Sequence, residues 1–182
     1  MSLEHIEAGI KEVRAKADPV RSRYDREVRN IQSDPNLSEE GKRAQIKDVA
    51  ADYKSRLVAL RDSETAIITS EVDRLERLVA STVGTTGSDI IAYRDAQDRA
   101  ERIQDANQAS QMMARALRNG DKTLAHAVFG RAIDAGYREA AQMYTELHPS
   151  LRDVASDLNA LKHAQTSTME RNLFYGTASW TA

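Results

Sequence analysis

The chain has 182 residues, and its 26 basic and 28 acidic side chains leave a formal net charge of -2. This balance provides no general attraction to a phosphate backbone, so we do not expect nucleic-acid binding. The sequence has no cysteine, which excludes disulfides, thiolate zinc sites and cysteine nucleophiles. Aromatic residues are few, at 5%, and the composition favours helices over sheets.

The first 32 residues predict one long helix. Apolar residues recur at alternating spacings of three and four from Leu3 to Tyr24, a heptad pattern that places them on one side of a helix. Asp18 and Pro19 interrupt the helix, because proline has no N–H and disfavours helical geometry at the preceding residue. Either the helix kinks there or a new helix starts with Asp18 as its N-cap; the unbroken apolar stripe favours a kink.

Segment 33–37, with the sequence SDPNL, predicts a turn, and Ser38 follows as the N-cap of a second helix. Helical spacing continues from there to about Val83. A helix of about 45 residues would be roughly 68 Å long and would extend beyond the first helix. The two helices therefore predict a hairpin over residues 1–83, which closes within one chain or pairs with another, because both arrangements satisfy the same pattern.

A loop at 84–88 leads to a third helix, predicted from Ser88 to about Leu117 and ended by Asn119 and Gly120. Either this helix, running back along the second, or a partner has to cover the part of the second helix that the first leaves bare. Three shorter helices are predicted next, over about 122–135, 137–147 and 150–165. The periodic pattern is lost from Gln165 onward.

The predicted fold is all-α. It consists of a coiled-coil-like helical hairpin over 1–83, a smaller helical bundle over 88–165 and an irregular C-terminal tail over 166–182. The N-terminus has no apolar signal-peptide region, and no stretch approaches the roughly 18 apolar residues of a membrane span. We therefore expect no secretion by a signal peptide and no membrane partner.

The sequence shows no arrangement typical of an active site. The four histidines are isolated, with no pair at the spacing that places two imidazoles on one metal ion. Carboxylates alternate with basic residues at helical spacing, which is typical of a water-facing helix. The basic run from Arg21 to Arg29 includes Asp25 and Glu27, and a self-paired surface explains it better than a nucleic-acid contact does. We expect a non-enzymatic chain without catalytic, cofactor-binding or metal-binding residues.

Two sets of side chains are candidate contacts for a protein partner. The first is the stripe of the second helix that lies beyond the reach of the first helix. The second is a group of large side chains in the tail, which either anchor on another surface or fold back on their own helices; both interpretations stay open. The candidates are Ile67, Ile68, Val72, Leu75, Leu78 and Val79 in the stripe, and Leu173, Phe174, Tyr175 and Trp180 in the tail.

Between Ala106 and Gly136 the chain resembles one tetratricopeptide repeat. The positions that match the turn and second helix of that repeat are Gly120, Ala125, Phe129 and Ala132. The first helix departs from the pattern, with Ala109, Met112, Met113 and Ala116 in place of its usual Trp, Leu, Gly and Tyr. No second copy stands about 34 residues away, so the resemblance implies a single helical hairpin and not a repeat array.

The whole chain also resembles small helical structural proteins of tailed bacteriophages, through segments 33–42, 117–121 and 144–149. This resemblance implies a structural or assembly role in a particle built from many copies, with binding to capsid, portal or copies of the chain itself. It also implies a homo-oligomer, located in the host cytoplasm during synthesis and then in the virion. It transfers no active-site residue. The alternative is a cellular helical adaptor that binds a peptide or protein partner.

Overall fold

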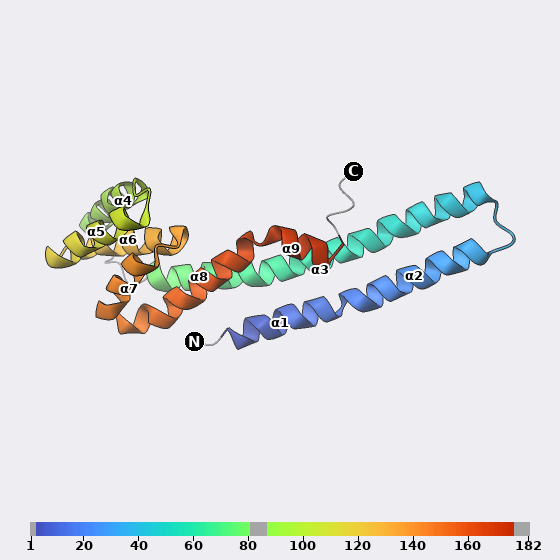
Figure 1. Ribbon diagram of the computed structural model, residues 1–182, viewed down its shortest axis with the longest axis horizontal. Coiled ribbons are helices and arrows are strands. Elements are labelled where there is room, and N and C mark those ends of the chain that lie inside the picture. Colours follow the sequence, from blue (N-terminus) through green and yellow to red (C-terminus); the bar gives the residue numbers. More distant parts are fainter. Residues whose placement is uncertain (1–2, 81–86, 177–182) are drawn as a thin grey trace. The chain divides into compact units, whose positions relative to one another are not determined.

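The computed structural model describes residues 3–80 and 87–176, and every regular element within these ranges is a helix (Figure 1). The predicted all-α fold is confirmed. The α-helices and one 3-10 turn are α1 Glu4–Ala15, α2 Ala17–Ser33, α3 Glu39–Ala80, α4 Gly87–Glu101, α5 Ala106–Arg118, α6 Lys122–Ala135, α7 Arg138–Leu147, η1 Pro149–Leu151, α8 Arg152–Thr166 and α9 Thr168–Phe174. None of these described helices is long and apolar enough to cross a membrane.

The chain divides into two compact units. The hairpin unit contains residues 3–70 and the segment from 164 onward, and the bundle unit contains residues 71–163. This division differs from the predicted one, which placed the whole second helix in the hairpin and left the tail outside both domains. The difference arises because the end of α3 makes its contacts within the bundle unit, whereas the C-terminal segment makes its contacts within the hairpin unit.

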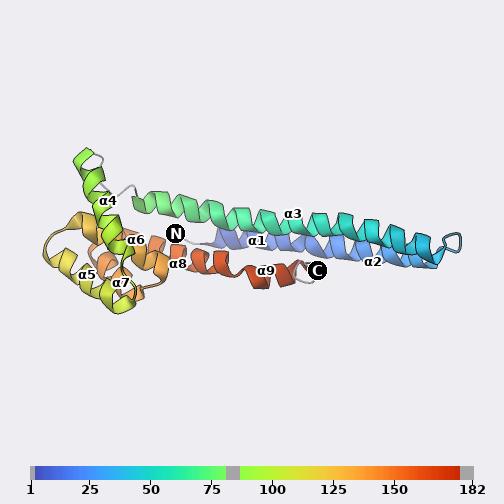
Figure 2. The same cartoon turned by 90° about the horizontal axis from the view of Figure 1, so that it is seen from above.

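The first arm of the hairpin consists of α1 and α2, which follow one another beside α3 in two perpendicular views (Figures 1 and 2). The break falls at Lys16, whose backbone, with φ -76° and ψ -14°, stays in the right-handed helical region. The break at Lys16 is therefore a kink, the alternative that the sequence favours over a new helix start at Asp18. Pro19 has no N–H to donate to the carbonyl of Ala15, and this explains why α1 ends at that residue.

The predicted turn between the arms is confirmed. Asp34 is extended, with φ -72° and ψ 114°, as expected before a proline. Its Oδ1 accepts a hydrogen bond from the Asn36 N–H at 2.8 Å. The Gly41 N–H donates to the Ser38 Oγ at 3.1 Å, so Ser38 caps the 42-residue helix α3 as predicted.

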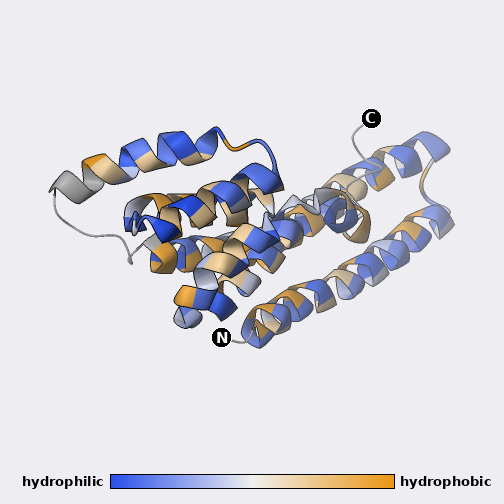
Figure 3. Cartoon of the chain, turned by 60° about the vertical axis from the view of Figure 1, so that its left-hand side comes forward, coloured by the Kyte–Doolittle hydropathy of each residue, from blue (hydrophilic) through white to orange (hydrophobic). Residues whose placement is uncertain are grey.

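The hairpin closes within one chain. The rings of Tyr24 on α2 and Tyr53 on α3 lie 5.6 Å apart between centroids. The Tyr53 hydroxyl donates a hydrogen bond to Glu27 at 2.9 Å. Apolar residues recur along α1 and α2 between polar ones (Figure 3), and the heptad stripe of the first arm faces α3 of the same molecule.

The third predicted helix proves to be two helices. In the structure α4 ends at Glu101 and α5 begins at Ala106, because Asp105 caps a new helix. The Asp105 Oδ1 accepts from the Gln108 N–H at 2.8 Å, and the Gln108 Oε1 accepts from the Gln104 N–H at 3.2 Å. An aspartate followed three residues later by glutamine is a helix-start signal in the sequence. Helix α4 packs on α6, which corrects the expectation of one helix running back along α3.

Helix α6 is the centre of the bundle unit and packs against α4, α5 and α7. Its buried Phe129 stacks on Tyr144 of α7, with ring centroids 4.4 Å apart. Gly120 and Gly136 follow α5 and α6 with φ of 66° and 73°, the left-handed conformation that ends helices and favours glycine. The boundaries predicted for α6, α7 and α8 lie close to the observed ones.

The tail is not irregular throughout. Helix α9 covers Thr168–Phe174 and ends before Gly176, whose φ is 68°. Seven residues are too few for a helix to be stable by itself, so contacts with the hairpin must hold it. Trp180 lies outside the described residues.

Candidate protein-binding site

A carboxylate occupies an apolar position in the stripe of α3. Tyr53, Leu57, Leu60 and Glu64 follow one another at spacings of four, three and four, so Glu64 points to the same side as its apolar neighbours. Its side chain is 1% exposed. A buried carboxylate is costly unless it is paired and hydrogen-bonded, so the surroundings of Glu64 must supply donors.

The donors come from α1 and from the residue that follows α9, and α9 itself adds a second positive charge. Arg14 on α1 donates from two guanidinium nitrogens to the two oxygens of Glu64, at 2.9 and 2.7 Å. The Tyr175 hydroxyl, just after α9, donates to Glu64 Oε2 at 2.8 Å. The Arg171 Nε of α9 lies 3.4 Å from Oε1. We call Glu64, Arg14, Arg171 and Tyr175 the Glu64 cluster.

The Glu64 cluster keeps its carboxylate charged. Burial by itself would raise the pKa of Glu64, but hydrogen bonds from Arg14 and Tyr175 and the charges of Arg14 and Arg171 outweigh it, so this pKa lies below its ordinary value. Burial and the hydrogen bond to Glu64 raise the pKa of Tyr175. Two guanidinium groups thus face one carboxylate, and removing that carboxylate would leave buried positive charge without compensation.

The lowered pKa of Glu64 predicts an acid-sensitive hairpin unit. A carboxyl group whose folded pKa is depressed stabilises the fold above its unfolded pKa, and this contribution is lost as the pH falls through the folded value. Glu64→Gln removes the titrating group and should flatten this part of the dependence. Urea unfolding at a series of pH values from 7 to 3 measures how the stability of the hairpin unit depends on pH. Hydrogen exchange of the α9 amides over the same range shows whether α9 is released. An equally steep acid loss in Glu64→Gln would contradict the assignment.

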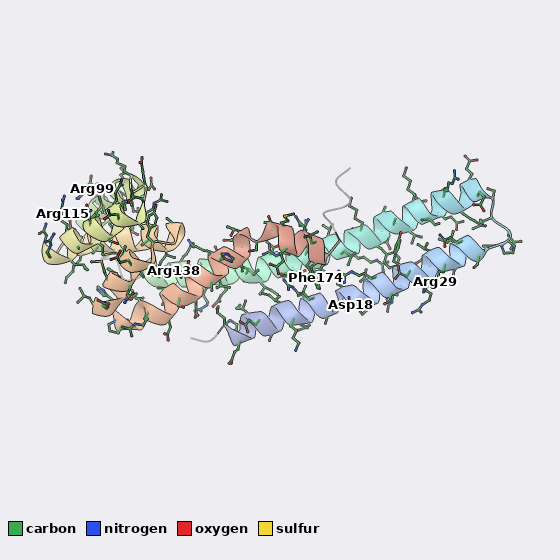
Figure 4. All side chains as sticks on the ribbon, viewed as in Figure 1. Asp18, Arg29, Arg99, Arg115, Arg138 and Phe174 are labelled. Carbon is green, nitrogen blue, oxygen red and sulfur yellow. The ribbon has the colours of Figure 1, made fainter. Side chains whose placement is uncertain are left out.

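Further contacts hold α9 against the first arm. The guanidinium carbons of Arg14 and Arg21 lie 5.0 and 5.1 Å from the centroid of the Phe174 ring, and Arg21 donates a hydrogen bond to the Phe174 carbonyl. The Tyr175 ring packs in one cluster with Ala17 and Leu57. Figure 4 shows Phe174 at the end of α9, near the part of the first arm where Asp18 is labelled. The inward face of α9 is therefore fixed by aromatic and charged contacts.

The outward face of α9 is apolar and uncovered. Met169 and Leu173 stand four residues apart, which places them on one side of the helix, and their side chains are 74% and 61% exposed. Phe174 beside them is also exposed, although arginines cover part of its ring. We call Met169, Leu173 and Phe174 the α9 strip. The α9 strip is therefore a candidate interaction surface.

Beyond α9 the stripe between the two arms is only half covered. Ala17 and Leu57 are buried where Tyr175 packs on them, whereas Val28, Ile31 and Val49 are half-buried. We call the half-buried residues Tyr24, Val28, Ile31, Ile46 and Val49 the open seam. The α2 residues 22–33 carry three basic and two acidic groups, and the α3 residues 39–52 carry three basic and four acidic groups, so the two arms have opposite net charges.

The structure places most of the predicted contact residues inside the chain. Ile68, Val72, Leu75 and Val79 are buried and Ile67 is half-buried, while Leu78 is 40% exposed. Ile67 and Ile68 belong to the hairpin unit, and the other buried members belong to the bundle unit. Of the tail residues, Tyr175 is buried, Leu173 and Phe174 are exposed, and Trp180 lies outside the described residues.

Sequence reasoning missed Glu64, Arg14, Arg171 and Met169. A charged residue at a heptad position was the available signal for Glu64, and the four-residue spacing of Met169 and Leu173 was the signal for the α9 strip. Within residues 3–80 and 87–176, no group of three or more acidic or histidine side chains is placed to hold a metal ion.

Comparison with known proteins identifies no relative: no family model, no curated protein and no solved structure matches the chain.

Proposed function

We propose that this chain is a non-enzymatic structural or assembly protein of a bacteriophage particle, and that it works by binding copies of itself through the hairpin unit. The observation that carries the proposal is the α9 strip, with Met169 and Leu173 held outward at 74% and 61% exposure. The Glu64 cluster fixes the opposite face of the same helix. Met169 and Leu173 stay exposed while Tyr175 of the same segment is buried, so the docked segment presents an apolar contact surface.

The open seam enlarges this surface. It continues the stripe that α9 covers at Ala17 and Leu57, and helices from a partner would complete its burial as in a helical bundle. A second copy suits it, because two seams that pair face to face with their turns at the same end place each arm against the partner's arm of opposite net charge. Such a contact has two-fold symmetry, so each residue of the surface is used twice.

The bacteriophage assignment is supported by the sequence resemblance in segments 33–42, 117–121 and 144–149. A particle built from many copies requires protein surfaces that bind one another, and helix faces with heptad spacing are suited to that task. Capsid and portal proteins are the further partners that the resemblance implies.

Replacing both Met169 and Leu173 with serine should weaken self-association about tenfold to hundredfold, since each side chain loses the free energy of burial at the interface. Sedimentation velocity over a concentration series measures the change. Leu147→Ser is the matched control, because Leu147 is 64% exposed on α7 in the bundle unit, and it should leave association unchanged.

The same three proteins, mixed with purified virions and with virion proteins, test the particle assignment. The proposal fails if wild-type protein neither associates with itself nor binds a virion protein. Equal weakening by the serine double variant and by Leu147→Ser would remove the α9 strip from the proposal.

A further inference from the structure

The bundle unit contains a cavity that the proposed assembly function does not use. It has a volume of about 530 Å³ and lies between the end of α3, α4, α6 and α8. This size falls in the range of cavities that bind small molecules or single side chains, roughly 300–1,000 Å³. The cavity therefore has room for a ligand.

Small side chains create the floor of the cavity. Ala100 of α4 and Ala127 and Gly130 of α6 line it, and a Cβ atom added at Gly130 would meet no atom within 4 Å. Ile133 and Leu158 add apolar surface beside them. The floor is thus suited to an apolar stem and not to a polar group that would lose its hydration.

Two neutral aromatic rings form one wall. The rings of Tyr93 and His126 lie 5.6 Å apart between centroids, at 53° to each other, and His126 Nδ1 lies 3.1 Å from the Tyr144 hydroxyl. Burial and the nearby His148 lower the pKa of His126, so its imidazole is neutral at pH 7. Burial and the charge of Asp134 raise the pKa of Tyr93, so its phenol is neutral as well.

Both cations in the lining already have partners. The Lys162 ammonium lies 2.6 Å from Glu76 Oε1 and also pairs with Asp134. Burial opposes its charge, but the hydrogen bonds to Asp134 and Glu76 outweigh burial and raise the pKa of Lys162. Arg131 donates to the carbonyl of Ile103 at 3.1 Å, while its Nε is buried and has no hydrogen-bond partner in the described part of the chain. An anionic ligand would therefore have to break the pairing of Lys162 or uncover the buried Nε of Arg131 to find a charged donor.

The lining carries a carboxylate in excess. Among the lining residues that the structure describes, the three carboxylates Glu76, Asp134 and Glu101 face two cations. Glu101 is exposed and makes no ion pair with a described residue. A cation entering the cavity would meet this carboxylate and the electron-rich face of Tyr93.

We propose that this cavity binds a cationic amine or guanidinium group carried on an apolar stem. The stem occupies the floor at Ala127 and Gly130, and the cation lies between Tyr93 and Glu101. Such a group comes either from a small-molecule amine or from a basic side chain of a protein partner. The inference goes beyond self-association and does not depend on it.

Nuclear magnetic resonance of the ¹⁵N-labelled full-length chain tests the site with three probes. Phenethylamine represents a small amine, N-acetyl-arginine amide represents a protein side chain, and phenylacetate has nearly the shape of phenethylamine with the opposite charge. At pH 7 we expect shifts of the Tyr93, His126 and Gly130 amides with at least one of the two cations and none with phenylacetate. Tighter binding of the arginine probe assigns the ligand to a protein side chain, and tighter binding of phenethylamine assigns it to a small amine.

Variants at Gly130 and Glu101 separate binding in the cavity from general attraction. Gly130→Leu fills the floor, where the space is open, and should abolish the shifts, whereas Gly130→Ala should retain them. Glu101→Gln should weaken binding about fivefold, as expected for one exposed charge. The proposal is overturned if neither cation binds up to about 10 mM, if phenylacetate binds as well as phenethylamine, or if Gly130→Leu binds like wild type.

Discussion

Glu64→Ala is expected to lower the unfolding free energy of the hairpin unit by about 3 kcal/mol, because it leaves the buried Arg171 and the partly exposed Arg14 without their counter-charge. The carboxylate accepts two hydrogen bonds from Arg14 and one from Tyr175, and Arg171 lies beside it. Its loss also releases the inward face of α9. Chemical denaturation gives the change in free energy, and hydrogen exchange shows whether the amides of α9 lose protection.

Asp62→Ala is the matched control for this variant. Asp62 lies two residues earlier on α3 and pairs with Arg61 at 2.8 Å on the exposed surface, so its removal should change stability by less than about 1 kcal/mol. If Glu64→Ala and Asp62→Ala have the same effect, the Glu64 cluster does not anchor the C-terminal segment.

Phe129→Ala is expected to cost the bundle unit about 3–5 kcal/mol, since it removes a fully buried ring and leaves a cavity. The ring stacks on Tyr144 at 4.4 Å and belongs to α6, against which α4, α5 and α7 pack. Hydrogen exchange should show lost protection in α5, α6 and α7. The cost to stability is measured by urea unfolding at pH 7.

Leu147→Ala on α7 provides the comparison, because its side chain is 64% exposed and its truncation should change stability by about 0.5 kcal/mol at most. Glu64→Ala and Phe129→Ala also test the division of the chain into two units. We expect each to lower protection in its own unit. A loss of protection spread evenly over the whole chain in both variants would contradict that division.

Heptad spacing and turn chemistry located the hairpin well. The kink before Pro19, the turn at 33–37 and the Ser38 cap each depend on a few neighbouring residues, so local sequence contains the information. The separation of α4 from α5 also depends on neighbouring residues, because Asp105 and Gln108 form the cap of α5. The alanine-rich sequence on both sides keeps helical spacing across this point, so periodicity alone predicts one continuous helix.

The candidate site was harder to predict because it depends on contacts between distant residues. Nothing near Glu64 in the sequence indicates that its partners are Arg14, 50 residues earlier, and Tyr175, 111 residues later. Helix α9 exists through these contacts and not through its own propensity. Periodicity identified the apolar stripe from Ile67 to Val79, but it could not show that the chain covers most of this stripe itself.

Light scattering of the wild-type protein over a concentration series tests the proposed self-association most directly. Self-association predicts a mass of at least twice the 20.3 kDa of one chain at about 50 µM. This mass should fall toward that of one chain on dilution or in the Met169 and Leu173 double serine variant. A mass of 20.3 kDa at every concentration would contradict self-association through the hairpin unit.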